Sequence, residues 1–94
     1  MSTYIMLMSW TDQGAYDFQD TIQRADGAAE AFEGAGGALK ESYWTMGPYD
    51  LVALGDLPDD ESASSAALKA SVETSVRTTT MRAFDCAEVD RILE

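Results

Sequence analysis

Tyr43-Trp44-Thr45-Met46-Gly47-Pro48-Tyr49-Asp50-Leu51-Val52 contains a Gly-Pro dipeptide between two segments rich in aromatic and aliphatic residues. Glycine next to proline marks a turn, whereas aromatic and β-branched residues favour strands. The pattern predicts a β-hairpin with strands over residues 39–46 and 49–57, joined by a loop of two or four residues centred on Gly47-Pro48.

Hydrophobic patterns on either side of this hairpin predict two more strands and two main helices. Residues 4–10 and 76–84 form apolar or threonine-rich runs that are typical of strands. Residues 20–35 carry Ile22, Ala25, Ala29 and Phe32 at helical spacing, with Asp20 as the expected N-terminal cap. A second helix is expected to open at Pro58-Asp59-Asp60-Glu61, where acidic side chains suit the helix dipole, and residues 87–93 predict a short terminal helix.

The resulting order, βαββαβ, indicates an α+β, ferredoxin-like fold. Right-handed crossovers place both main helices on one face of a four-stranded antiparallel sheet, with the expected strand order 4-1-3-2. At 94 residues, the chain is expected to form a single domain over residues 1–94.

Four motifs in order resemble the GYD domain family. They are Thr11-Asp12-Gln13-Gly14, Gly47-Pro48-Tyr49-Asp50, Pro58-Asp59-Asp60 and Val76-Arg77-Thr78-Thr79-Thr80-Met81-Arg82-Ala83-Phe84. The resemblance covers nearly the whole chain and implies a ferredoxin-like fold with no settled activity. Two features depart from the family pattern: Thr74-Ser75 stands where a glycine often precedes the last strand, and a proline common at the start of the first helix is missing.

The first strand predicts an interface, because large apolar side chains alternate onto both of its faces. One set is Tyr4, Met6, Met8 and Trp10, and the other contains Ile5 and Leu7. Both helices cover the same face of the sheet, so the other face is bare within one chain, and burying each large apolar side chain is worth about 1.5 to 3 kcal/mol. We expect a homodimer or higher homo-oligomer of the dimeric α/β-barrel type, formed by sheet-to-sheet packing. The alternative is that the C-terminal tail folds back over the sheet.

Composition narrows the expected partners and location. Seventeen Asp and Glu against six Lys and Arg give a formal charge of −11, which argues against nucleic acid and anionic membranes as partners. The dispersed acidic residues suggest a halophilic host, with an acidic mesophilic protein as the alternative. A single cysteine, Cys86, and the lack of a signal-peptide pattern or a membrane-length apolar run predict a cytoplasmic protein.

Several common chemistries lack their usual residues. The chain contains no histidine, which argues against metal and haem roles, so we expect no cofactor and no metal. Gly34-Ala35-Gly36-Gly37 follows a predicted helix and precedes a strand, which is the reverse of a phosphate-binding loop. No serine has an imidazole base to activate it.

The candidate ligand-binding residues are Glu41, Tyr43, Asp50 and Arg77. Cross-strand pairing in the hairpin places Glu41, Tyr43 and Asp50 on one side of the sheet, where apolar neighbours can raise the pKa of a carboxyl group. Asp50 or Glu41 would then transfer a proton, and Tyr43 would donate to a small carbonyl or aromatic ligand between sheet and helices. Arg77 would anchor an anionic group across the dimer. The alternatives are that Asp50 orders the turn, Glu41 is a solvated edge charge and Arg77 forms a surface salt bridge.

Three functions fit these observations, and the sequence leaves enzymatic activity open. The leading interpretation is a GYD-type homo-oligomer that holds a small ligand. The second is a cofactor-independent small oxygenase or isomerase, by analogy of fold alone. The third is a structural or regulatory interaction module. An apolar pocket walled by Glu41, Tyr43 or Asp50 would favour a ligand, whereas a filled interior with those groups in water would favour the interaction module.

Overall fold

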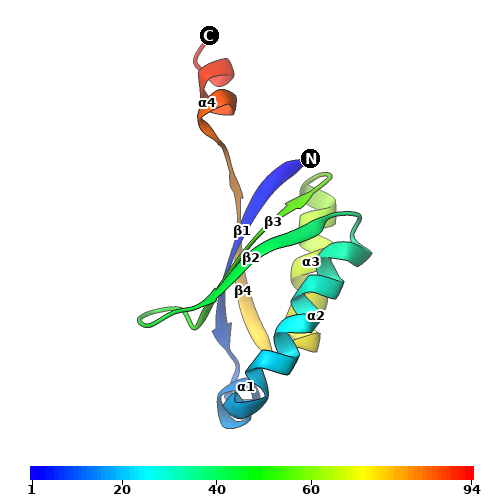
Figure 1. Ribbon diagram of the computed structural model, residues 1–94, viewed down its shortest axis with the longest axis vertical. Coiled ribbons are helices and arrows are strands. Elements are labelled where there is room, and N and C mark those ends of the chain that lie inside the picture. The colour runs from blue at the N-terminus through cyan, green and yellow to red at the C-terminus, as the bar shows by residue number, and fades with distance from the viewer.

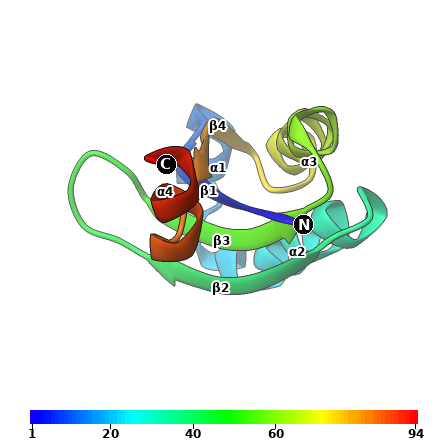
Figure 2. The same ribbon diagram turned by 90° about the horizontal axis from the view of Figure 1, so that it is seen from above.

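The computed structural model describes all residues, 1–94, and contains one antiparallel sheet with two helices on one of its faces (Figures 1 and 2). The strands are β1 (Ser2–Trp10), β2 (Ala38–Trp44), β3 (Leu51–Leu57) and β4 (Val76–Ala83), and the main helices are α2 (Thr21–Gly34) and α3 (Asp60–Glu73). The sheet order is β2-β3-β1-β4, which confirms the predicted order and the α+β, ferredoxin-like class. No helix combines the length and apolarity that crossing a bilayer requires.

Three short helical segments complete the chain. They are α1 (Asp12–Tyr16), the 3-10 turn η1 (Phe18–Asp20) and α4 (Cys86–Ile92). The sequence predicted only α4, because α1 and η1 are too short to show a hydrophobic period. The prediction that Asp20 caps α2 is wrong: its side chain makes no capping hydrogen bond, since η1 leads the backbone into α2 already in a helical turn.

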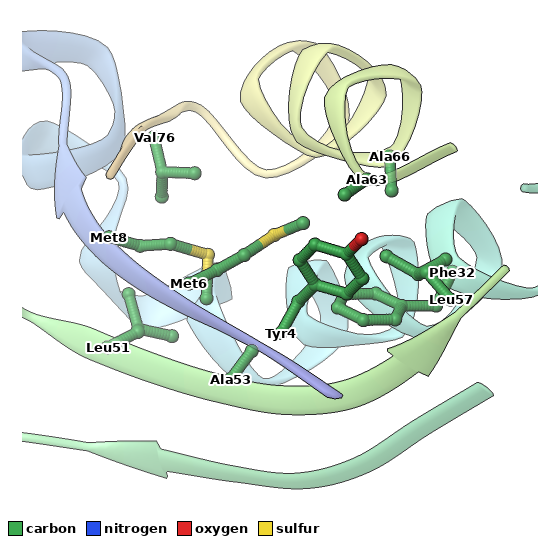
Figure 3. Packing of buried hydrophobic residues seen from close by; sticks show 10 residues of the cluster. All are labelled: Tyr4, Met6, Met8, Phe32, Leu51, Ala53, Leu57, Ala63, Ala66 and Val76. Carbon is green, nitrogen blue, oxygen red and sulfur yellow. The ribbon is translucent and has the colours of Figure 1, made fainter. Parts of the chain in front are cut away.

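The core lies between the sheet and the two main helices (Figure 3). Its members are Tyr4, Met6, Met8, Phe32, Leu51, Ala53, Leu57, Ala63, Ala66 and Val76. Helix α2 buries Ala28, Ala31 and Phe32, whereas Ile22, predicted to face the core, is 73% exposed. The ring of Phe32 fits directly over Gly55 of β3, where an added Cβ would lie 2.4 Å from the ring. This close approach fixes which face of α2 meets the sheet.

The hairpin has the predicted register but a longer loop. Tyr43 pairs with Val52 and Glu41 with Leu54, as the sequence predicted. The strands stop at Trp44 and Leu51, however, so the loop spans residues 45–50 instead of two or four residues. Gly47 in this loop has a φ of +105°, a left-handed conformation that glycine adopts at low cost.

The sheet face opposite α2 and α3 is uncovered. Helix α4 follows β4 and extends beyond the end of the sheet instead of folding back over it (Figure 1). The alternative of a covering tail is therefore wrong, and the second face of the sheet is bare within one chain, as the strand pattern predicted.

Candidate functional site

The uncovered sheet surface, which we call the open face, is apolar at its centre. Strand pairing defines it: Ile5 of β1 lies opposite Leu54 of β3 and Met81 of β4, and Leu7 lies opposite Val52. Directly opposed residues project to the same side of a sheet, away from the buried set that contains Tyr4 and Met6. Its main apolar residues are Ile5, Leu7, Tyr43, Val52, Leu54 and Met81. The aliphatic residues of β1 and β3 are half-buried by their neighbours, whereas Met81 and Tyr43 are 42% and 54% exposed.

A hydrogen-bonded pair lies on the β2 edge of the open face. The hydroxyl of Tyr43 donates to Oε2 of Glu41 at 2.7 Å, and both side chains are exposed. The two residues are alternate positions of one strand, which brings them to the same side. The hydrogen bond to the carboxylate, with its negative charge, raises the pKa of the Tyr43 phenol and keeps it protonated as a donor.

Asp50 lies where the hairpin loop meets the end of β1. Its Oδ2 accepts from the backbone N–H of Trp10 at 2.9 Å, and its own N–H donates to the carbonyl of Met8 at 2.9 Å. The carbonyl of Asp50 accepts from the N–H of Thr45 at 2.8 Å. Asp50 thus ties both ends of the loop to β1, the ordering role that the sequence offered as the alternative to catalysis.

Arg77 lies on the opposite edge strand, β4, and is paired with Ser9 of β1. Two strands lie between β4 and β2, so these edge strands are about 14 Å apart at the usual spacing, and Arg77 is also four residues further along the sheet than the position level with Glu41. The three salt bridges of the chain are Arg24–Asp17, Lys40–Asp56 and Arg82–Glu88. Arg77 is in none of them, so the surface salt bridge expected as its alternative role is not formed within the chain. The structure brings Glu41 and Tyr43 together and leaves Asp50 and Arg77 apart from them.

The family model of the GYD domain matches residues 4–93, which is nearly the whole chain. The chain belongs to the GYD domain family. A solved structure, TTHA0845 from Thermus thermophilus, is similar with a TM-score of 0.57 and 28% identity, over 92% of this chain and 96% of that one. No curated protein matches the chain.

In this GYD domain, the motif Gly47-Pro48-Tyr49-Asp50 lies in the hairpin loop and shapes it. Gly47 supplies the left-handed backbone and Asp50 the hydrogen bonds at the base of the loop. Met46 is 97% exposed in this longer loop and Tyr49 is only half-buried, so neither belongs to the core. Trp44 lies on the helix side of the sheet, where its indole N–H donates to the hydroxyl of Thr21 at 2.8 Å.

A cavity of about 20 Å³ lies between the sheet and α2, which is room for a water-sized molecule. Its walls are mostly apolar and come from Met8, Trp10, Thr21, Arg24, Ala25, Ala28, Ser42, Leu51, Ala53, Thr74 and Val76. None of the four predicted site residues is among them, because Glu41 and Tyr43 oppose Leu54 and Val52 and therefore face away from the helices. The expectation that these groups face the space between sheet and helices is thus wrong for the single chain.

Thr21, Arg24 and Ser42 supply polar groups to this cavity and were not among the predicted site residues. Ser42 lies between Glu41 and Tyr43 in β2, so strand alternation alone would have placed it on the helix side. Thr21 and Arg24 lie one turn apart at the start of α2, and only the orientation of that helix brings them there. No group of three or more His, Cys, Asp or Glu side chains is placed to hold a metal ion.

Proposed function

We propose that this GYD domain acts as a cytoplasmic homodimer, or a higher homo-oligomer, formed by packing two open faces together. The apolar open face carries this proposal, since no part of the same chain covers it. A contiguous apolar surface of this kind is rare on a monomer and is typical of an interface. The exposed free thiol of Cys86 supports a reducing location, where it stays unpaired.

The free energy gained by burying two open faces against each other is large enough to offset the cost of association. A two-fold interface uses the same surface from both copies, so each apolar side chain is buried twice. These side chains are already partly buried in the single chain, so each gains less than a fully exposed one would. Removing the six main residues of both open faces from water therefore contributes on the order of 10 kcal/mol in total. This is comparable with the roughly 4 to 15 kcal/mol that association costs in translational and rotational freedom. A stable pair therefore needs most of the open face.

The test is a charged substitution at the centre of the open face. Leu54→Asp places a carboxylate from each copy in the interface and should weaken dimerisation by at least about 100-fold, since an unpaired buried charge costs several kcal/mol. Val72→Asp is the matched control, because Val72 lies on α3 and is 80% exposed. Sedimentation of the wild type and both variants over a range of concentrations measures the dissociation constants, and circular dichroism confirms folding. A monomeric wild type, or a Leu54→Asp variant that associates like the control, would overturn the proposal.

A second candidate function is ligand binding at the rim of this interface. The hydrogen-bonded Tyr43–Glu41 pair supports it, because a phenol and a carboxylate next to an apolar surface can orient a small carbonyl or aromatic molecule. Thermal shift with acetophenone and benzoate tests this on the wild type and on Tyr43→Phe, Glu41→Gln, Asp50→Asn and Arg77→Gln. A stabilisation that Tyr43→Phe and Glu41→Gln abolish would support the site. No stabilisation of the wild type by either probe, or a response unchanged in all four variants, would exclude binding of these probes there.

A further inference from the structure

The C-terminal arm, residues 84–93, has no place to pack within its own chain. It contains Phe84 and the helix α4, which extends past the end of the sheet and away from α2 and α3 (Figure 1). No residue of α4 is buried. Two side-chain interactions join the arm to the body, and both involve Arg82: its guanidinium lies 4.7 Å from the ring centre of Phe84 and 3.8 Å from the carboxylate of Glu88.

The sequence nevertheless specifies a helix in the arm. Asp85 and Glu88 form a reciprocal capping box, in which the N–H of Glu88 donates to Oδ1 of Asp85 at 2.8 Å and the N–H of Asp85 donates to Oε1 of Glu88 at 3.2 Å. At seven residues, however, α4 is well below the roughly 12 to 15 residues that an isolated helix needs to be stable in water. Its stability must come from packing against another surface.

The arm also presents the apolar stripe that such packing needs. Ile92 and Leu93 follow Val89 by three and four residues, which puts them on the same side of the helix as Val89. Their exposed fractions are 40%, 62% and 79%, and Phe84 at the root of the arm is 47% exposed. Nothing in the chain covers this stripe.

We propose that the C-terminal arm packs on a second copy of the chain, so that each subunit clasps its partner. The inference rests on the proposed dimer and identifies a second contact in it. Ala83, the last residue of β4, lies on the open face, and α4 begins three residues later, so the arm starts at the edge of the open face. A copy seated on the open face therefore reaches the root of the arm.

Arg91 on the arm belongs to none of the three salt bridges, and it shares a surface hollow with Phe84, Glu88 and Ile92 among others. The arm carries three carboxylates against this one arginine, so it is acidic, as is the rest of the chain. Its packing on a second copy therefore depends on the apolar stripe, and Arg91 is free to pair locally with a carboxylate of that copy.

The first experiment removes the stripe without touching the open face. In the double variant Val89→Asp/Ile92→Asp, the dissociation constant measured by sedimentation should rise at least tenfold, because two apolar contacts from each copy are lost. Leu68→Asp is the matched control, since Leu68 lies on α3 and is 71% exposed. An unchanged dissociation constant in the double variant would overturn the role of the arm.

The second experiment locates the arm directly, using Cys86, the only cysteine and an exposed one. A benzophenone-maleimide label on Cys86 is photolysed in a mixture of ¹⁴N and ¹⁵N chains. Cross-linked peptides that combine both isotopes support packing on a second copy, whereas cross-links confined to one chain contradict it. A monomeric wild type would refute the dimer and the arm together. A dimer that Leu54→Asp weakens, but whose arm gives only cross-links within one chain, would refute the arm alone.

Discussion

The carbonyl oxygen of Ser75 accepts two hydrogen bonds from Thr11, one from its backbone N–H at 3.0 Å and one from its hydroxyl at 3.1 Å. The same hydroxyl accepts from the N–H of Gly14 at 3.2 Å and so caps α1. A Cβ added at Gly14 would lie 2.4 Å from the Ser75 oxygen. The turn before β4 is therefore fastened to the end of β1 by a close contact that requires glycine at position 14.

The backbone of Ser75 is strained in this turn. Its φ of +54° is left-handed, which costs a residue with a Cβ roughly 1 to 2 kcal/mol. Ser75→Gly should raise the free energy of unfolding by about 1 kcal/mol, after the larger entropy of the unfolded glycine is counted. Ser64→Gly, in the middle of α3, should lower it by about 0.5 kcal/mol. Urea unfolding at one protein concentration measures the free energy of unfolding of both variants. A Ser75→Gly variant less stable than the wild type would show that the backbone of Ser75 is not strained.

Replacing Gly55 or Gly34 by alanine is expected to change the stability of the protein in opposite directions. A Cβ at Gly55 would lie 2.4 Å from Phe32 and 2.7 Å from the carbonyl of Ala38, so Gly55→Ala should cost about 1 to 3 kcal/mol through overpacking. At Gly34, in the last turn of α2, the nearest atom is Nζ of Lys69 at 3.8 Å, and Gly34→Ala should gain up to about 1 kcal/mol. Thermal unfolding of the two variants checks the opposite signs. Equal effects would show that Phe32 does not rest on Gly55.

If Asp50 orders the hairpin loop, its substitution should lower the stability of the protein, which a purely catalytic role would not predict. Asp50→Ala leaves the N–H of Trp10 without its charged acceptor and should cost about 1.5 to 3 kcal/mol. Asp50→Asn keeps an oxygen acceptor and should cost roughly half as much. Asp26→Ala, at an exposed position on α2, is the control, because it removes one negative charge without removing the hydrogen bonds of Asp50. Unfolding of Asp50→Ala at the same urea concentration as the control would contradict the ordering role.

The sheet was predictable because its determinants are local and periodic. Strand alternation placed Ile5 and Leu7 opposite the core set, and the handedness of crossovers fixed the order of the strands. The register of Tyr43 with Val52 followed from the position of the turn. The uncovered face followed in turn from the topology, since both helices occupy the same side.

The candidate site was less predictable, because it depends on orientation and not on spacing. The length of the loop was set by the hydrogen bonds of Asp50, which hydrophobic pattern does not reveal. The face of α2 was set by the contact of Phe32 with Gly55, so Thr21 and Arg24 reached the cavity wall unforeseen. Glu41 and Tyr43 were correctly grouped, but they face away from the helices, where the expected ligand space lies.

The excess of acidic residues predicts a response to salt. With a formal charge of −11, self-repulsion destabilises the compact state at low ionic strength, and the Debye length falls to about 3 Å at 1 M salt. We expect the melting temperature to rise by several degrees between low and molar KCl, as the suggested halophilic host implies. Repeating the salt series on Glu30→Lys/Glu33→Lys, with a smaller net charge, should give a smaller rise. A melting temperature that is unchanged or lower in concentrated salt would count against a halophilic protein.

Tyr4 predicts how stability declines at alkaline pH. Its hydroxyl donates to Oδ1 of Asp60 at 2.6 Å, and this hydrogen bond, together with burial, raises the pKa of Tyr4 above its ordinary value near 10. Above pH 10, the unfolded chain releases this proton before the folded protein does. The contribution of Tyr4 is therefore complete below pH 10 and is lost as the pH rises through the folded pKa.

Tyr4→Phe should lower the free energy of unfolding by about 0.5 to 1.5 kcal/mol at pH 8, through the lost hydrogen bond, and should flatten the decline above pH 10. Tyr16→Phe, at a position that is 85% exposed, should change neither the value nor the slope. Urea unfolding between pH 8 and about pH 11 measures both, within the range where tyrosine titrates. Parallel declines for the wild type and Tyr4→Phe would show that Asp60 does not hold the Tyr4 proton in the folded protein.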